Sequence, residues 1–290
     1  TTAVSLMYLY LSKIVEKKYL DFYIPDRYSE GYGISDEGIN FAKENGFSLI
    51  IALDCGIKAL DKIEYASSLG IDFIICDHHL PGEELPKAFA VLDPKRTDCR
   101  YPYKELSGCG VGFKLCQGLN TIYKIPENEL YELTDLLAIS IAADIVAMTG
   151  ENRVLAKLGL KTLRKTRKLG IRLLIPEEKI ATFDISNIVF EIAPKINAAG
   201  RISHGKAAVE LMISDNLKHA HQIVDDILNL NDSRRELDAN TTQSAFNQVI
   251  ETQQENNFTT VVYHNEWNKG VIGIVASRLT EVYYKPTLVF

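Results

Sequence analysis

The sequence predicts an α/β protein with a parallel sheet, followed by a helical part, a long connecting helix and the start of a second α/β unit. Over the N-terminal third, apolar runs of strand length alternate with helical segments of roughly 10–15 residues, which is typical of βαβ units. From residue 108 the pattern is mostly helical, until a new apolar run begins at 258. These two observations carry the fold class.

The first elements can be placed from periodicity and capping. Residues 3–18 have the pattern of an amphipathic helix, and residues 21–25 favour a short strand. Ser35 is a helix-capping residue followed by two acids, which predicts a helix start. Apolar runs predict three strands, and a helix that ends at Gly70 separates the first two. The strands are expected at 48–53, 72–76 and 89–92, and the helix at 58–69.

The second half of the chain divides differently. Residues 217–256 contain no proline or glycine and are polar, so they predict a long helix that bridges two bodies. A strand at 258–263, a helix at 271–284 and a strand from 286 to 290 follow. We therefore predict a first domain at 1–213, a connecting helix at 214–256 and a second domain from 257. So short a unit cannot form its own core, and we expect it to continue beyond residue 290.

Composition excludes several classes of protein. The net charge of −6 and the pI near 5.6 argue against broad, non-specific nucleic-acid binding. No apolar run approaches the roughly 20 residues that a bilayer requires, and the start is not that of a signal peptide. The five cysteines form no Cys-x-x-Cys pair, which excludes a zinc ribbon and fits a reducing compartment. We expect a cytoplasmic protein with no membrane partner.

Acids and histidines follow the predicted strands. Asp54 comes directly after the strand at 48–53, and Asp77, His78 and His79 follow the strand at 72–76. Carboxyl ends of parallel strands are where ligands bind in open α/β sheets. Imidazole is the commonest metal ligand, and a neighbouring carboxylate can orient it. A polar loop with two chance histidines is the alternative interpretation.

A third acid extends this predicted site. Asp144 ends an apolar helix whose last residues are small, so its carboxylate could approach a ligand closely. Alternatively, Asp144 caps the next segment. Two carboxylates and one imidazole, Asp54, Asp144 and His78, suit Mn²⁺ or Mg²⁺ better than structural Zn²⁺.

Residues 153–172 are basic without a single acid. Arg153, Lys157, Lys161, Lys165, Lys168 and Arg172 recur at steps of three or four residues, which predicts one helical face. This face could follow a phosphate backbone, or it could simply be a solvated helix surface.

Three of these segments resemble the successive motifs of the DHH phosphoesterases. They are Asp54-Cys55-Gly56, Asp77-His78-His79 with Pro81, and Ala142-Ala143-Asp144. Further stretches resemble the RecJ branch of single-strand-specific exonucleases. They lie at 30–33, 92–96, 110–115 and 192–201, and residues 267–279 resemble the opening of the DHH-associated domain.

The resemblance implies a metal-dependent 5′→3′ exonuclease that hydrolyses phosphodiester bonds of single-stranded DNA in repair and recombination. It implies a two-metal site for Mn²⁺ or Mg²⁺, in which Asp54 bridges both ions while His78 and Asp144 each bind one. His79 would contact the scissile phosphate and Asp77 would orient a histidine. Implied partners are single-stranded DNA, a single-strand-binding protein and a helicase.

The resemblance also implies residues that bind phosphates of the strand. These are Arg201, Lys269, Gly270, Gly273, Ser277 and Arg278. Gly273 could instead permit close helix packing, and Tyr32 or Tyr101 could stack on bases.

Two departures and two rivals accompany the resemblance. The family has an Asp-x-Asp-Gly segment before a Thr-Ala helix start, and this sequence begins at Thr1-Thr2-Ala3, so we expect the stretch as written to cleave poorly. Cys55 replaces a more usual Asn. An oligoribonuclease or cyclic-dinucleotide phosphodiesterase would carry a glycine-rich stretch ending in His, which we do not find. An inactive single-strand-binding relative would be expected to have lost its ligands.

Overall fold

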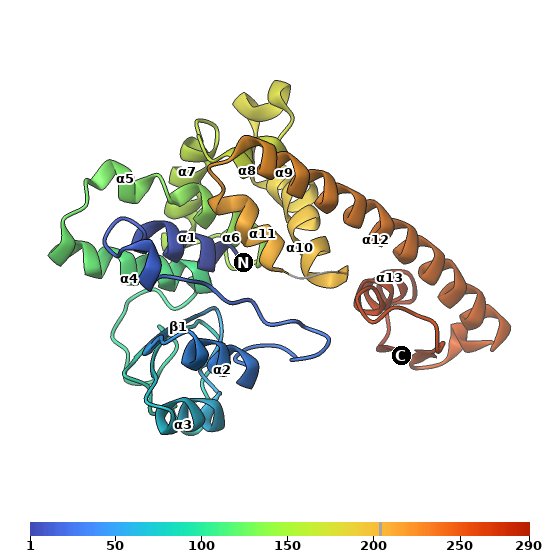
Figure 1. Ribbon diagram of the computed structural model, residues 1–290. Coiled ribbons are helices and arrows are strands. Elements are labelled where there is room, and N and C mark those ends of the chain that lie inside the picture. Colours follow the sequence, from blue (N-terminus) through green and yellow to red (C-terminus); the bar gives the residue numbers. More distant parts are fainter. Residues whose placement is uncertain (203–204) are drawn as a thin grey trace.

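The computed structural model describes residues 1–202 and 205–290, without the side chains of residues 199–202. Figure 1 shows three parts: a small sheet with two covering helices, a helical body, and a C-terminal unit at the far end of one long helix. In chain order the elements are α1 (Thr2–Leu11), η1 (Lys17–Tyr19), α2 (Asp36–Glu44), β1 (Leu49–Leu53), α3 (Leu60–Ser68), β2 (Asp72–Cys76), β3 (Ala90–Leu92), α4 (Gly108–Tyr123), α5 (Glu127–Tyr131), α6 (Thr134–Ala143), α7 (Gly150–Leu163), α8 (Leu169–Leu174), η2 (Glu177–Thr182), α9 (Ile185–Asn187), η3 (Ile188–Ile192), α10 (Ala193–Ile202), α11 (Lys206–Ile213), α12 (Leu217–Glu251), η4 (Gln254–Asn256), β4 (Thr260–Val262), α13 (Ile272–Tyr283) and β5 (Thr287–Val289).

The first sheet is parallel, in the order β1-β2-β3. Leu53 pairs with Cys76, and Cys76 pairs with Leu92, so all three strands end in register. The residues that follow these strands therefore share one edge of the sheet. The α/β class predicted from the sequence is confirmed.

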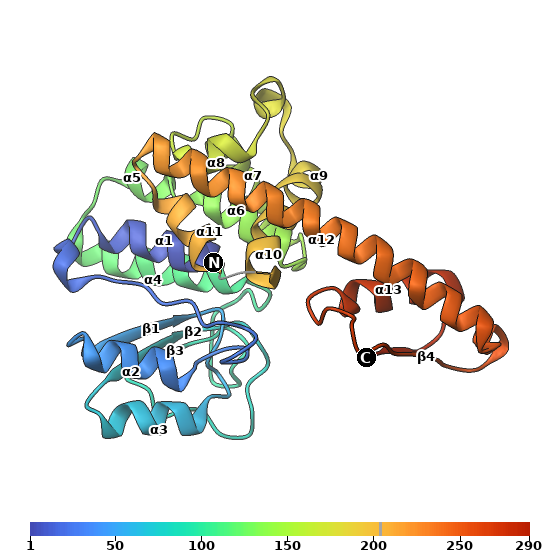
Figure 2. The same ribbon diagram turned by 45° about the vertical axis from the view of Figure 1, so that its right-hand side comes forward.

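The strands are buried on both faces because their side chains alternate between two cores. Phe73 and Ile75 of β2 pack with α2 and α3 on one face. Ile74 and Cys76 point the other way and join the large core of the helical body. Figure 2 shows the resulting layers, with α2 and α3 below the sheet and α1 and α4 above it. Near-continuous apolar runs are what such a doubly covered sheet requires.

Several predicted boundaries agree with the structure and two do not. Ser35 caps α2 by accepting the N–H of Gly38 at 3.1 Å. The expected strand at 21–25 is wrong, because these residues pair with no strand of the described chain. The helix expected at 3–18 ends at Leu11, for which we have no physical account.

The C-terminal unit shares a small core with the long helix, as expected of a unit too short to form a core alone. Val262 of β4 and Val275 and Leu279 of α13 are fully buried against Ala245 and Val249 of α12. β4 pairs in parallel with β5. Because α12 supplies one wall of this core, the division of the chain at 213 and 256 stays a prediction. Within the described residues, no helix combines the length and apolar character needed to cross a bilayer.

Candidate metal centre

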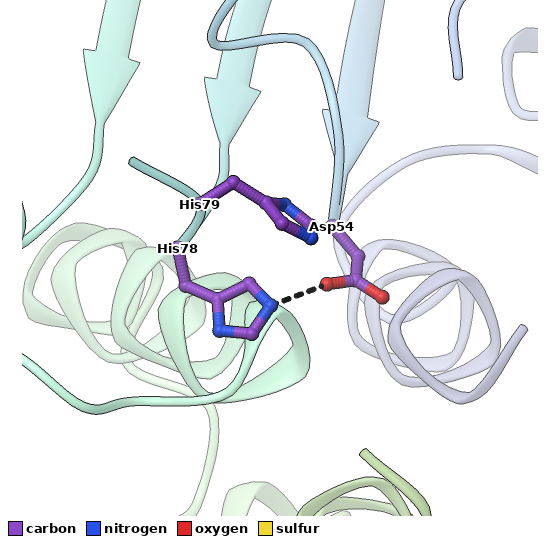
Figure 3. A group of neighbouring side chains, drawn as sticks. All are labelled: Asp54, His78 and His79. Atoms are coloured by element: carbon purple, nitrogen blue, oxygen red, sulfur yellow. Dashed lines mark ion pairs between the residues drawn. The ribbon is translucent and has the colours of Figure 1, made fainter. Parts of the chain in front are cut away.

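The candidate centre lies at the carboxyl edge of the first sheet. Asp54 follows β1, and Asp77, His78 and His79 follow β2 (Figure 3). Asp54 has a left-handed backbone (φ 66°), and its N–H donates to the carbonyl of Cys76 at 2.8 Å. An aspartate tolerates this conformation better than most residues. The turn directs the Asp54 carboxylate toward the histidines of the neighbouring strand.

The side chains of Asp54, His78 and Asp144 converge. His78 Nε2 lies 3.1 Å from Asp54 Oδ1 and 3.4 Å from Asp144 Oδ2. The ligand atoms of Asp54, His78 and His79 all lie within 4.8 Å of one another. Asp144 comes from the end of α6, so three separate segments of the chain meet here.

One glycine makes this approach possible. A Cβ atom placed on Gly108, the first residue of α4, would lie 2.0 Å from Asp54 Oδ1 and 2.6 Å from Asp54 Cβ. The start of α4 therefore forms a wall against which the Asp54 carboxylate rests. Ser107 caps this helix by accepting the N–H of Gly110 at 3.1 Å, which fixes the position of Gly108.

Asp77 is buried behind the centre and orients its neighbours. Its Oδ2 accepts the N–H of Ile57 at 3.0 Å, while Oδ1 accepts the N–H of His78 and lies 2.7 Å from His79 Nδ1. Although burial opposes ionisation, these hydrogen bonds lower the pKa of Asp77, so it remains a carboxylate. With Nδ1 held by Asp77, the other ring nitrogen of His79 has no hydrogen-bond partner among the described residues, and the ring lies beside Asp54 (Figure 3).

The electrostatics of the centre favour a bound cation. Burial and the charge of Asp54 raise the pKa of Asp144, because two carboxylates repel each other in this enclosed place. Burial alone would lower the pKa of His78, but Asp54 and Asp144 outweigh it and the pKa is raised. Like-charged carboxylates held together around an imidazole are the usual preparation for a metal ion.

Unsatisfied atoms provide a test of whether a metal fits. Among the described residues, Asp54 Oδ1 and His78 Nε2 are buried without a hydrogen-bond partner, although they lie 3.1 Å apart. Buried polar atoms normally have a partner, so two such atoms facing each other require an explanation. Oxygen and imidazole donors in this arrangement fit Mn²⁺ or Mg²⁺.

Comparisons with known proteins agree with this geometry. Residues 1–141 match the family model described as "DHH family, N-terminal domain". The chain is 41% identical over 293 residues to the single-stranded-DNA-specific exonuclease RecJ of Bacillus subtilis, covering 99% of this chain and 36% of that protein. It is 34% identical over 289 residues to RecJ of Escherichia coli, covering 93% and 50%.

A solved structure, described as exonuclease RecJ bound to manganese, superimposes with a TM-score of 0.88 at 30% identity. The match covers 99% of this chain and 71% of that one. The chain belongs to the RecJ branch of the DHH family. It spans 36% and 50% of the two curated RecJ relatives named above.

In this RecJ-type chain the predicted phosphate-binding residues at 269–278 belong to the C-terminal unit, whose helix α13 lies apart from the sheet that carries the centre (Figure 1). Arg278 forms an ion pair with Asp238 of α12 at 2.6 Å, and Ser277 donates to the carbonyl of Gly273 at 3.1 Å. A side chain on Gly273 would meet nothing within 4 Å, so close packing does not explain that glycine. Lys269 is exposed and Gly270 donates its N–H to Asn268 Oδ1 in the turn before α13.

Other predicted residues have mixed outcomes. Arg201 lies in α10, but its side chain is outside the described part of the chain. Tyr101 donates a hydrogen bond to Glu151 at 2.7 Å and packs against the main core, which favours a structural role over base stacking. Tyr32 is exposed, and its ring lies 5.7 Å from the Arg27 guanidinium.

The spacing predicted that the basic residues at 153–172 form one helical face, and this prediction is wrong. α7 ends at Leu163 and α8 begins only at Leu169, because Thr166 and Lys168 turn inward to the fully buried Asp135. Lys168 Nζ lies 2.8 Å from Asp135 Oδ2, and Arg172 pairs with Glu177 at 3.4 Å. Exposed basic residues at four-residue steps remain on α7. They are Arg153, Lys157 and Lys161.

Two residues near the centre were not predicted from the sequence, because their importance depends on where the fold places them. A capping serine before a glycine-rich helix start indicates that some group approaches the helix closely. It does not predict that the group near Gly108 is Asp54. Asp93 follows β3 in register with Asp77, and its buried Oδ2 has no partner among the described residues. Asp93 directly follows the strand predicted at 89–92, so the rule that identified Asp54 and Asp77 also applies to it.

Proposed function

We propose that this chain contains the metal centre of a 5′→3′ exonuclease that hydrolyses phosphodiester bonds of single-stranded DNA in repair and recombination. The observation that carries the proposal is the convergence of Asp54, His78 and Asp144 at the sheet edge, with His79 beside them. Membership of the RecJ branch supports single-stranded DNA as the substrate, because the curated relatives are named for it.

In this proposal Asp54, His78 and Asp144 hold Mn²⁺ or Mg²⁺. When bound, the ion polarises the phosphoryl oxygen and lowers the pKa of water, which supplies the nucleophile for hydrolysis. As the resemblance to the DHH motifs implies, Asp54 would be the residue shared by two ions, and the solved relative bound to manganese supports the choice of metal.

The protein's own groups position the substrate. Asp77 holds Nδ1 of His79 at 2.7 Å, which fixes the ring so that its second nitrogen can contact an oxygen of the scissile phosphate. The Ile57 N–H fixes Asp77 in turn, so the pair is held from the backbone. Such fixed orientation lowers the entropy cost of bringing the phosphate to the reacting position.

Away from the centre, we propose that Arg201, Lys269 and Gly273 bind phosphates of the strand and that Tyr32 stacks on a base. Gly270 and Ser277 would bind phosphate in exchange for their hydrogen bonds to Asn268 Oδ1 and to the carbonyl of Gly273. Arg278 could contact phosphate only with its exposed edge, since Asp238 takes one of its N–H groups. A single-strand-binding protein and a helicase are the proposed partners, and the cytoplasm is the proposed compartment.

The deciding experiment compares the chain with its His78→Ala and Asp144→Asn variants. Mn²⁺ binding is followed by electron paramagnetic resonance, and nucleotide release is followed from end-labelled single-stranded and duplex DNA. The wild type should bind Mn²⁺ and, at the low rate expected of the stretch as written, release nucleotides from single strands in preference to duplex, from the 5′ end. Both variants should lose metal and turnover together. Equal Mn²⁺ binding by the wild type and both variants would refute the site.

The substrate class is tested separately. Short RNA oligomers and cyclic dinucleotides are offered to the same preparation. If nucleotides are released faster from the RNA oligomers or the cyclic dinucleotides than from single-stranded DNA, the chain would be assigned to the oligoribonuclease or cyclic-dinucleotide phosphodiesterase class. Strand binding without metal-dependent release, in a chain that binds Mn²⁺ and carries the family's Asp-x-Asp-Gly segment, would support a binding module instead.

A further inference from the structure

Ile145 is a strained residue next to a proposed metal ligand. It follows Asp144 directly and has a left-handed backbone with φ of 53°. L-residues avoid this region because Cβ approaches the carbonyl oxygen, and a β-branched side chain makes the crowding worse. The position just after a helix C-cap is usually glycine or asparagine for this reason. Here α6 ends and an isoleucine takes that position.

Burial does not compensate this strain. The Ile145 side chain is 86% exposed, so it contributes little to the core. Val146, the next residue, packs against the main core and anchors the segment. A glycine at 145 would adopt this backbone conformation without strain, and the fold would lose little buried surface. Strained residues that persist without folding benefit concentrate at functional sites.

Ile145 is close in the chain to the proposed metal centre. Asp144 Oδ2 lies 3.4 Å from His78 Nε2, so Ile145 is the exposed residue that directly follows a side chain of the centre. Tyr32 is exposed as well, and partial desolvation and the charges of Asp54 and Asp144 raise the pKa of its hydroxyl. Two exposed apolar side chains thus lie near a charged centre suited to phosphate chemistry. The apolar parts of a nucleotide are its base and the carbon face of its sugar.

We propose that Ile145 is a substrate-contacting residue that packs against the sugar and base of the nucleotide whose phosphate enters the metal centre. The inference rests on the proposed function. An aliphatic contact has no hydrogen-bonding preference, so it holds any of the four bases equally. It therefore gives affinity for unpaired nucleotides without sequence specificity.

The test uses a substitution that separates folding from binding. Ile145→Gly relieves the strain and removes the apolar contact, so stability and affinity should change in opposite directions. Tyr284→Gly is the matched control, because Tyr284 is also left-handed (φ 51°) and 89% exposed but follows α13 in the C-terminal unit. The probe is a 5′-phosphorylated oligodeoxythymidylate with cleavage-resistant phosphorothioate links, offered with Mn²⁺. A second probe lacks the bases at its two 5′-terminal positions.

We expect Ile145→Gly to raise the urea midpoint by about 0.3 M and to weaken binding of the complete strand about tenfold, or about 1.4 kcal/mol. For the strand without terminal bases, which keeps only the sugar part of the contact, the loss of affinity should be smaller than for the complete strand. Tyr284→Gly should also raise the midpoint but leave both affinities unchanged. A lowered midpoint for Ile145→Gly, or an unchanged affinity for the complete strand, would overturn the inference. A wild-type chain that binds neither strand with Mn²⁺ would refute the proposed function as well, and the two failures are thereby distinguished.

Discussion

At the scale of the residue, Asp77 is the carboxylate on which the centre depends. It is 1% exposed and accepts hydrogen bonds from the backbone of Ile57, His78 and His79. A carboxylate can accept all of these bonds at once, whereas an amide must present donors to some of them. The negative charge of Asp77 is therefore a structural requirement as well as an aid to His79.

Asp77→Asn should accordingly destabilise the protein and misdirect His79. We expect a loss of about 2 kcal/mol in the free energy of unfolding, since a buried acceptor is replaced by a donor that faces other donors. Urea denaturation measures this loss. Asp72→Asn, at the exposed start of the same strand, is the control and should be nearly neutral. Equal effects of the two substitutions would contradict the proposed role of Asp77.

The pH dependence of stability should reveal His78. Burial lowers its pKa, but Asp54 and Asp144 reverse this and the pKa in the folded state is raised above 6.5. A folded state that binds the proton more tightly than the unfolded state is stabilised at low pH. The contribution of His78 is thus fully present below pH 6.5 and is lost as pH rises through the folded pKa.

In metal-free protein, held in chelator, His78→Gln should remove this component. The unfolding free energy of the variant should decline less between pH 6 and pH 8 than that of the wild type. His219→Gln, on the exposed start of α12, should leave the profile unchanged. Parallel profiles for wild type and His78→Gln would show that His78 has an ordinary pKa.

At the scale of the element, the start of α4 and the end of β1 are shaped to fit each other. Gly108→Ala would place a methyl group 2.0 Å from Asp54 Oδ1, so the carboxylate must move. We expect this variant to lose Mn²⁺ affinity by more than tenfold while the helix itself still forms. Calorimetric titration with Mn²⁺ measures the effect.

Gly118→Ala is the control on the same helix. A side chain there meets nothing within 4 Å, so only helix propensity changes, and we expect a gain of up to about 1 kcal/mol in stability with Mn²⁺ affinity intact. If Gly108→Ala also kept its Mn²⁺ affinity, Asp54 would not be held in place by this helix.

The basic residues of α7 provide the next prediction at this scale. Arg153, Lys157 and Lys161 are exposed and form no ion pair within the described chain. If they follow a single strand, replacing all three by Glu should weaken binding of single-stranded DNA. It should also reduce the slope of log affinity against log salt by about 2, because each phosphate that a cation neutralises on a single strand adds about 0.7 to that slope.

Substitution of Lys17, Lys87 and Lys218 by Glu changes the net charge equally on other surfaces and serves as the control. A slope reduced as much by this control as by the α7 variant would assign the effect to net charge alone. An unchanged slope in the α7 variant would mean that these residues form a solvated helix surface and do not contact the strand.

At the scale of the whole molecule, α12 connects the helical body to the C-terminal unit. Its first half packs in the main core, through Ile223 and Ile227, and its second half packs under α13, through Val249. Asp238, between these halves, is 3% exposed and is paired with Arg278. The Asp238–Arg278 ion pair joins the C-terminal unit to α12.

Asp238→Ala should loosen this attachment, since it leaves Arg278 without its partner. We expect amide hydrogen exchange to increase severalfold in β4 and α13 while the sheet β1-β2-β3 keeps its protection. Asp232→Ala, which removes an exposed ion pair with Arg235 on the same helix, is the control and should change neither region. Faster exchange in the first sheet after Asp238→Ala would mean that the two parts fold as one cooperative unit.

The sequence by itself determined the fold class, the three strands of the first sheet and the convergence of Asp54, His78 and Asp144. For Asp54 and His78 it could do so because apolar strand runs and the polar residues that end them are local signals, and parallel strands bring their ends to one edge. Asp144 ends a helix, and its place in the centre was predicted from the small residues before it and from the resemblance to a DHH motif. The long helix and the strand–helix–strand pattern after it were predicted for the same reason.

Only the tertiary structure decided what depends on distant partners. Lys168 has the spacing of a basic face, but it forms an ion pair with the buried Asp135 of another helix. Gly108 and Ile145 matter through contacts and backbone angles that no local pattern encodes. Residues 21–25 have strand-forming composition without a strand partner in the described chain, because pairing requires a neighbour as well as a propensity. Local chemistry selects which residues can form a centre, and packing between distant segments selects which of them do.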